Sequence, residues 1–434
     1  MNAHWGALGA GLLVGVLSLA PVSFASDAPT GGDQQGASPV SDAGLHRQLR
    51  GLIRRGGVAV AFDGEMRFVH GPGRYVPASI LKLATAQAAL HELGPDFRFR
   101  TEVYLDADNI LYVRGLGDPF LVSEEWRRMG AELERLGVFQ LELKRLVVDT
   151  SAFDPNLVVD GVEYTLNPYD ARPGALVTNF NTINLMVYRG SRVESAEPQT
   201  PLTPLGQELV KKLKLRPGEQ RINLSRNPAN GPRYSGEVAL AVFRDQGARI
   251  KGGFAFGVVP SGLKPVLVHR SDQPLTEVIA GMLEFSNNFV ANQLLLQIAL
   301  KHDGPPALLN SGVERLRRFL IDQIGLPPES FHLVEGSGIS RGNRMDLQSM
   351  LRITDAFYPW RGLMRAHKGG ERVVLAKTGT LKGVYSLAGF LPAPAGERRT
   401  FVVMLNQSRF TREKVLDRLL SAFAAPGLDM AEGP

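Results

Sequence analysis

Residues 77–90 read PASILKLATAQAAL, and this stretch decides how the chain is expected to fold. Its apolar residues recur near helical spacing and Gly94-Pro95 supplies a stop, so the stretch predicts a helix that begins at Ser79. Ser79 and Lys82 stand three positions apart and therefore share one helix face. The start of a helix also presents free N–H groups and positive potential beside Ser79. Because a neutral lysine accepts a hydroxyl proton, the pair could supply a nucleophilic serine and its base. Taken alone, however, the pattern favours a helix-capping serine beside a solvated lysine.

A second motif interrupts the next strongly helical segment, which runs from Pro274 to Leu300. Ser286 and Asn288 place a hydroxyl and an amide at the break, where they can take part in a polar site. Taken alone, the pattern favours a helix cap or a break between two helices over a catalytic role. The chain also holds a chance copy, Ser225-Arg226-Asn227, in a stretch rich in Pro, Asn and Gly.

A third motif, KTGT, occupies residues 377–380 at the end of a strand-like run that begins at Val373. Its members are Lys377, Thr378, Gly379 and Thr380. A cation and two hydroxyls along an edge strand suit a substrate carboxylate, and the glycine permits close approach of a ligand or of backbone. The simpler interpretation of the motif alone is a strand end with an exposed lysine.

The three motifs are more informative together than singly, because of their order and the elements on which they lie. S-x-x-K, S-x-N and K-T-G follow one another on a helix, a helix break and a strand, and this set is typical of penicillin-binding proteins and class A β-lactamases. A second S-x-x-K, Ser261 to Lys264, contains Gly262 and precedes Pro265, so we expect it to be a loop that keeps its two side chains apart. The joint pattern indicates hydrolysis through an acyl-serine.

Composition narrows the class further. The chain has 434 residues, 44% of them hydrophobic and 21% charged, which suits a sizeable core and two or more domains. Its formal charge of +6 is scattered, which indicates solubility and weak attraction to an anionic wall or membrane surface; no motif indicates nucleic acid. The absence of cysteine excludes disulfides and thiolate chemistry. None of the eight histidines falls in a metal-binding spacing, so we expect no metal and no cofactor.

The first 26 residues carry no Lys, Arg, Asp or Glu, and Trp5 to Ala20 is an apolar run. A small-x-small pattern ends at Ala25, so residues 1–25 are expected to be a signal peptide and residues 26–41 a flexible linker. An uncleaved membrane anchor is the alternative, because the uncharged stretch is long enough to span a bilayer. Both interpretations place the body outside the cytoplasmic membrane, and we expect it in the periplasm.

Strand-like runs near both ends of the chain predict a split domain. They cover residues 58–62, 66–70, 373–380, 385–391 and 400–406. These runs are expected to form one antiparallel sheet that unites residues 42–95 with residues 266–434. Residues 96–265 alternate short strand-like runs with turns and are expected to form a β-rich inserted domain.

The sequence resembles the D-alanyl-D-alanine carboxypeptidase/endopeptidase family, the penicillin-binding protein 4-like, class C low-molecular-mass penicillin-binding proteins of peptidase family S13. The resemblance covers nearly the whole mature chain. Besides the three motifs, the matching segments are Pro77-Ala78 before Ser79, Gly117-Asp118-Pro119, Asn179-Phe180-Asn181, Glu335 to Arg341 and Lys377 to Val384.

This resemblance implies an α+β fold: a penicillin-binding transpeptidase-type domain, with an antiparallel sheet flanked by helices plus a helical lobe, interrupted between the first and second motifs by the inserted domain. It further implies the following roles. Ser79 is acylated, Lys82 is its base, Ser286 relays a proton to the leaving amine, and Asn288 and Lys377 hold the polar network. Thr378 and Thr380 bind the carboxylate or amide side of the substrate beside Gly379, the backbone N–H groups of Ser79 and Thr380 form the oxyanion hole, and Arg341 contacts a diaminopimelate-type side chain.

The implied substrate is a peptidoglycan peptide, and the implied inhibitors are β-lactams that bind covalently. The sequence departs from the family pattern at Asn287 and Asn292, where acidic residues are common, and its insertion is short. A β-lactamase is the nearest enzymatic alternative, but no E-x-x-x-N segment lies between Asn288 and Lys377 to supply a deacylating glutamate. A non-catalytic wall-binding module is the alternative from another class. The residues indicate neither an oligomeric state nor a preference between terminal release and cross-link cleavage.

Overall fold

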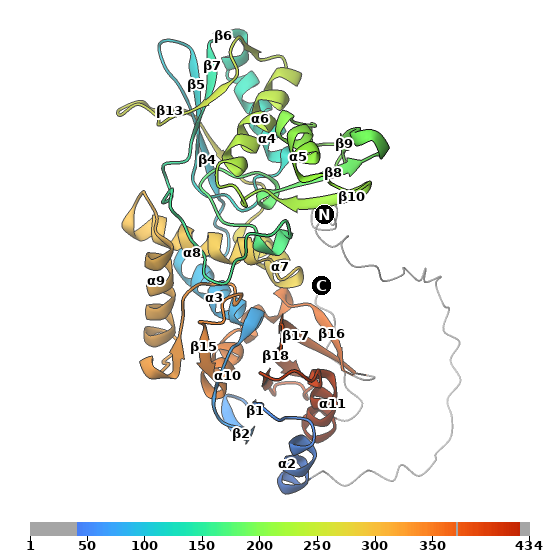
Figure 1. Cartoon of the computed structure of the whole chain (residues 1–434). Helices are drawn as coiled ribbons and strands as arrows, with labels where there is room; N and C mark the ends of the chain where they lie inside the picture. The colour runs from blue at the N-terminus through green and yellow to red at the C-terminus, as the bar shows by residue number, and fades with distance from the viewer. Residues whose placement is uncertain (1–40, 370–371, 426–434) are drawn as a thin grey trace, which may run out of the picture.

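The computed structural model describes residues 41–369 and 372–425. The expected signal peptide and all but the last residue of the expected linker lie outside the described residues. Within the described part of the chain, no helix is both long and apolar enough to cross a membrane. The fold is α+β: an antiparallel sheet and a helical lobe occupy the lower half of Figure 1, and the inserted region occupies the upper half.

The six-stranded sheet joins strands from both ends of the described chain in the order β16-β17-β18-β19-β1-β2. Its strands are β1 (Gly56–Phe62), β2 (Glu65–His70), β16 (Ala366–Gly369), β17 (Arg372–Leu381), β18 (Val384–Leu391) and β19 (Arg399–Leu405). β1 pairs with β19 along its whole length, from Gly56 opposite Leu405 to Phe62 opposite Arg399. The expected antiparallel sheet built from both ends is therefore present. β16 is an additional strand that the sequence analysis did not identify.

Helices cover both faces of this sheet. α2 (Asp42–Arg50) and α11 (Arg412–Phe423) pack on one face. Successive residues of a strand point to opposite faces, so Val58 packs in this core while its neighbour Ala59 packs in the core of the helical lobe. The continuous apolar run of β1 thus reflects burial on both sides.

The helical lobe lies on the second face. It comprises α3 (Lys82–Leu93), α7 (Leu275–Glu284), α8 (Asn288–Asp303), α9 (Leu309–Asp322) and α10 (Leu347–Ala356). A small sheet beside it contains β3 (Arg74–Tyr75), β14 (Phe331–His332) and β15 (Arg344–Asp346). Asn287 caps α8 by accepting a hydrogen bond from the N–H of Val290, so this helix begins directly after the predicted break.

The inserted region has its own sheet, in the order β12-β7-β5-β4-β13. Its strands are β4 (Arg100–Leu105), β5 (Ile110–Gly115), β7 (Arg145–Asp149), β12 (Phe254–Phe256) and β13 (Pro265–Arg270). Beside it lie β8 (Thr182–Val187), β9 (Val193–Ser195) and β10 (Gly218–Asn223) in a second sheet, the short pair β6 (Glu142–Leu143) and β11 (Arg249–Ile250), and the helices α4 (Ser123–Arg135), α5 (Pro204–Leu213) and α6 (Asn230–Asp245).

The three helices of the inserted region were not identified from sequence, which suggested strands and turns alone. α6 shows why: it opens with Asn230-Gly231-Pro232, residues that are typical of turns. Proline is nevertheless tolerated in a first helical turn, because the N–H that it lacks would have no partner within the helix.

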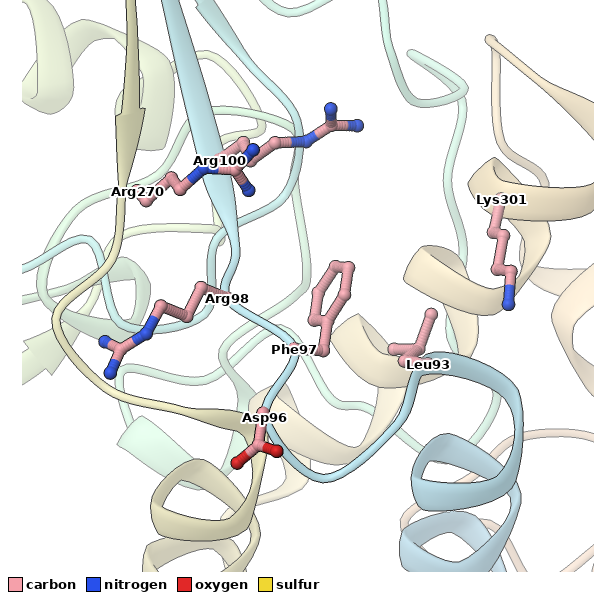
Figure 2. A pocket seen from close by; sticks show the side chains of 7 residues that line it. All are labelled: Leu93, Asp96, Phe97, Arg98, Arg100, Arg270 and Lys301. Carbon is pink, nitrogen blue, oxygen red and sulfur yellow. The ribbon is translucent and has the colours of Figure 1, made fainter.

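The chain crosses between the lobe and the inserted region twice, and the two crossings lie side by side. The N–H of Ser271 donates to the carbonyl of Phe99 at 2.9 Å, and that of Leu275 to the carbonyl of Phe97 at 2.8 Å. A cavity of about 440 Å³ opens at this junction; Figure 2 shows its lining residues Leu93, Asp96, Phe97, Arg98, Arg100, Arg270 and Lys301. Because β13 pairs with β4, we propose that the inserted domain continues to Arg270 rather than ending at residue 265.

Candidate active site

Ser79 lies in a single 3₁₀ turn, Ala78–Leu81, directly before α3. The preceding residue, Ala78, has a positive φ of 52°, which is rare for a residue with a side chain and marks a backbone held in place by its surroundings. Two glycines allow that packing. A Cβ on Gly338 would lie 1.9 Å from the carbonyl oxygen of Ala78, and one on Gly379 would lie 3.0 Å from the backbone nitrogen of Ser79. The strand that carries KTGT therefore packs directly against the backbone of Ser79.

Lys82 is fully buried, and its amine is aimed at the serine. Nζ donates to Ser79 Oγ at 3.1 Å, to Asn288 Oδ1 at 2.7 Å and to the carbonyl oxygen of Ser337 at 2.8 Å. Burial lowers the pKa of Lys82 well below its usual value, the nearby charge of Lys377 lowers it further, and Glu335 acts in the opposite direction. The arrangement favours a neutral amine within reach of a serine hydroxyl, as a general base requires.

Ser286 and Asn288 lie where α7 gives way to α8. Ser286 adopts a positive φ of 54°, so the chain turns sharply here, and its hydroxyl accepts a hydrogen bond of 2.9 Å from Lys377 Nζ. Asn288, the first residue of α8, bonds Lys82 through Oδ1 and donates through Nδ2 to the carbonyl oxygen of Tyr169 at 3.2 Å. Since Tyr169 belongs to the inserted region, that region helps to orient a residue of the site.

Lys377 is buried on β17, on the face toward the helical lobe. Burial, followed by the charge of Arg412, lowers its pKa to about 7. The hydroxyl of Thr380 accepts a hydrogen bond of 3.3 Å from Arg412. β16 pairs with β17 from Arg372 to Leu375 only, so residues 377–381 keep a free edge on that side within the described structure. A substrate backbone can pair along such an edge.

The residues predicted from sequence therefore lie together in one site, except Arg341, which lies at its edge. The three motifs are linked by the bonds of Lys82 to Ser79 and Asn288 and of Lys377 to Ser286. Arg341 is exposed, and its guanidinium donates to the carbonyl of Lys382 in the turn after β17. The chance copies at Ser225 and Ser261 lie in loops outside this group, as expected.

Glu335 is the residue whose role sequence reasoning missed. Its buried carboxylate accepts hydrogen bonds from the N–H and the hydroxyl of Ser337, at 2.7 and 2.6 Å, and from the N–H of Gly338 at 2.7 Å. Asn292, one of the departures from the family pattern, donates to the same carboxylate at 3.0 Å. These bonds fix the loop whose Ser337 carbonyl accepts from Lys82. The match of Glu335 to Arg341 with a family segment was the available signal.

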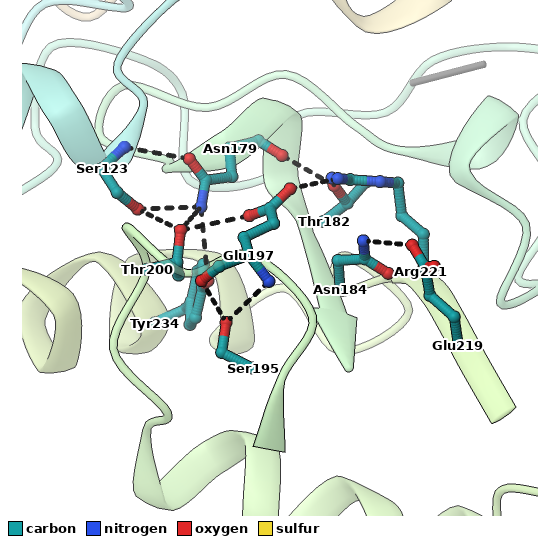
Figure 3. Close-up of polar contacts among 10 residues, drawn as sticks. All are labelled: Ser123, Asn179, Thr182, Asn184, Ser195, Glu197, Thr200, Glu219, Arg221 and Tyr234. Carbon is teal, nitrogen blue, oxygen red and sulfur yellow. Dashed lines mark hydrogen bonds and ion pairs between the residues drawn. The ribbon is translucent and has the colours of Figure 1, made fainter. Parts of the chain in front are cut away.

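A second buried polar cluster lies in the inserted region (Figure 3). Asn179 Oδ1 accepts from the N–H of Ser123 at 3.1 Å, and its Nδ2 donates to the Ser123 hydroxyl, also at 3.1 Å. Thr200 donates to Glu197 at 3.1 Å, and the other oxygen of Glu197 pairs with Arg221. We call these residues the Asn179 network. Among its members, the charged groups are paired with each other.

Comparison with known proteins finds relatives of this chain. The profile of the D-Ala-D-Ala carboxypeptidase 3 (S13) family matches residues 69–361 and 359–423. A D-alanyl-D-alanine carboxypeptidase from Actinomadura sp. is 26% identical over 466 residues, covering 88% of this chain and 84% of the relative. The D-alanyl-D-alanine carboxypeptidase DacB of Haemophilus influenzae is 26% identical over 387 residues, covering 76% of this chain and 80% of the relative.

The fold is also similar to a solved one. The crystal structure of penicillin-binding protein 4 from Haemophilus influenzae superposes with a TM-score of 0.71 at 21% identity, covering 87% of this chain and 98% of that chain. The expected transpeptidase-type fold with an inserted domain is thereby confirmed. Since the family profile spans most of the sequence, the chain belongs to the D-Ala-D-Ala carboxypeptidase 3 (S13) family of serine peptidases.

Proposed function

We propose that this enzyme acts as a serine DD-peptidase on peptidoglycan peptides, with Ser79 as nucleophile and Lys82 as base. The observation that carries the assignment of roles is the buried amine of Lys82, which has a lowered pKa and lies 3.1 Å from Ser79 Oγ. The named activity of the two D-alanyl-D-alanine carboxypeptidase relatives supports the choice of substrate.

The first half-reaction forms the acyl-enzyme. Ser79 Oγ attacks the carbonyl carbon between two D-alanine residues while its proton passes to Lys82 Nζ. The backbone N–H groups of Ser79 and Thr380 stabilise the resulting oxyanion, and the close approach of Gly379 to Ser79 supports this placement. The carbon–nitrogen bond then breaks, and Ser286 relays a proton to the departing amine.

The second half-reaction releases the acyl group. Water attacks the ester carbonyl, Lys82 takes a proton from the water, and Ser79 regains its hydroxyl proton as the carbon–oxygen bond breaks. Lys377 and the hydroxyls of Thr378 and Thr380 hold the substrate carboxylate, while Asn288 orients the amide of the acyl side. Arg341, at the other end of the free edge, contacts a side chain of the wall peptide.

A β-lactam acylates the serine by the same first step, because its strained amide reacts with the hydroxyl. Its amine stays attached to the acyl group and cannot depart. A structure of penicillin-binding protein 4 from Haemophilus influenzae holds a bound β-lactam, which supports this for the present chain. We further propose that the enzyme works in the periplasm, where its substrate lies, and that its contact with a membrane is peripheral. The uncharged N-terminal segment supports export.

Intact-protein mass spectrometry tests the mechanism. After incubation of the protein with benzylpenicillin, we expect an adduct of penicillin mass that persists and is absent from Ser79→Ala. Rapid loss of the adduct with turnover of penicillin would favour a β-lactamase. A folded wild-type protein that forms no adduct would overturn the enzymatic assignment in favour of a wall-binding module.

A further inference from the structure

A cavity of about 340 Å³ lies beside the active site, where β16 separates from β17. On the side toward the active site, the pairing of β16 with β17 ends at Ala366 opposite Leu375. Just beyond this pair, the backbone N–H of Ala376 donates a hydrogen bond to the carbonyl of Arg365. Lys377 and Thr378 form one wall of the cavity. The cavity is thus continuous with the free edge that is proposed to hold the substrate, and it falls in the size range of small-ligand sites, roughly 300–1,000 Å³.

The charged residues that line this cavity are mainly cations. Arg365 and Lys368 are exposed side chains on its β16 side, and neither forms an ion pair with another described residue. His367 between them is paired with Glu413 at 2.9 Å. One acid, Glu284 at the end of α7, also lines the cavity. With Lys377 included, cations outnumber the acid, so the cavity favours an anionic ligand.

The proposed mechanism determines which part of a substrate would reach this cavity. The scissile carbonyl lies at the N–H groups of Ser79 and Thr380, and the leaving amine lies toward Ser286, whose hydroxyl is bonded to Lys377. Along β17, the leaving group therefore extends from Thr380 toward Lys377 and so toward Arg365. The acyl side extends the other way, toward Arg341.

We propose that this cavity binds the leaving-group side of a cross-linked wall peptide, with Arg365 and Lys368 holding its acidic groups. The inference rests on the proposed DD-peptidase function. A terminal D-alanine ends at its carboxylate beside Thr378 and leaves the cavity empty. A cross-linked substrate continues past that point as an acidic peptide, which fills the cavity. The two cations therefore favour cleavage of cross-links over release of terminal D-alanine.

Two substrates separate these activities. One is a pentapeptide that ends in D-Ala-D-Ala, and the other is a cross-linked muropeptide dimer whose sole DD bond is the cross-link. For Arg365→Ala/Lys368→Ala we expect kcat/KM on the dimer to fall about tenfold, because two charge contacts are lost, and kcat/KM on the pentapeptide to change less than about twofold. Added salt should lower the wild-type preference for the dimer.

The matched control is Lys211→Ala/Lys212→Ala, which removes two exposed cations from α5 in the inserted region and should leave both values unchanged. An equal fall on both substrates, or no fall on the dimer, would overturn this inference while leaving the DD-peptidase assignment intact. A folded wild-type enzyme that cleaves neither substrate and forms no penicillin adduct would overturn the proposed function itself.

Discussion

The active site and the Asn179 network are both buried and polar, yet they treat charge in opposite ways. Lys82 and Lys377 are at most 4% exposed, and neither forms an ion pair with a described residue. In the Asn179 network, the Arg221 guanidinium meets the carboxylate of Glu197. Burial lowers the pKa of both lysines, whereas the Arg221–Glu197 ion pair holds two segments of the inserted region together. Burial of polar groups thus favours the proposed base in one region and a structural ion pair in the other.

The largest effect should come from removing the unpaired base. Lys82→Met keeps the apolar stem of the side chain but removes the amine that we propose takes the Ser79 proton. We expect the rate constant of acylation by benzylpenicillin to fall by roughly a thousandfold. We also expect the unfolding free energy to fall by less than about 1 kcal/mol, because removal of a desolvated amine offsets the loss of its hydrogen bonds to Asn288 and Ser337. Time-resolved mass spectrometry and thermal unfolding measure the two quantities, and acylation near the wild-type rate would contradict the role of Lys82.

The Asn179 network should respond in the reverse manner. Arg221→Met leaves the Glu197 carboxylate buried without its partner, so we expect a loss of about 3 kcal/mol of unfolding free energy. The value of kcat/KM per folded molecule should change less than about twofold. Denaturant unfolding and a peptide hydrolysis assay measure these quantities.

An exposed ion pair on the same sheet provides the control for this prediction. Arg192 and Glu194 lie 3.0 Å apart with side chains 69% and 52% exposed. Arg192→Met should therefore lose less than about 1 kcal/mol. Equal losses of unfolding free energy in the two variants would contradict this prediction. So would a fall in kcat/KM of Arg221→Met without a loss of unfolding free energy.

The smallest effect concerns the pH dependence of Lys377. Its pKa of about 7, lowered by burial and then by Arg412, means that the free enzyme loses this charge as pH rises through that value. We expect kcat/KM for a D-Ala-D-Ala peptide to decline several-fold between about pH 6 and 8, since the substrate carboxylate loses its cation. Arg412→Gln should move the decline to higher pH. A profile that is identical in the two proteins would contradict the role of Arg412.

The sequence predicted those parts of the site that depend on local spacing. Ser79 and Lys82 are three residues apart, so helical geometry alone brings them together, and strand-like runs indicated every strand of the six-stranded sheet except β16. Glu335 was missed because its carboxylate acquires a role only when its loop folds back against α3 and α8. The cavity beside β16 was missed for the same reason, because Arg365 approaches Lys377 through strand pairing that no short motif encodes.

The inserted region was predicted least well. Its β-rich character was recognised, but the turn-like start of α6 concealed a helix whose apolar face is defined only by the sheets beside it. Long-range packing therefore decided what local propensity left open.

The pairing of β1 with β19 has a consequence for the synthesis of the enzyme. Chain elongation produces β1 and Ser79 early, but β17, which carries Lys377, and β19, which closes the sheet, come from the last part of the described chain. Contacts so distant in sequence form slowly and only after the intervening domain has been made. The strand order thus delays hydrolytic competence until β17, β18 and β19 have been synthesised, so a fragment that ends before β17 carries the proposed nucleophile without the means to use it.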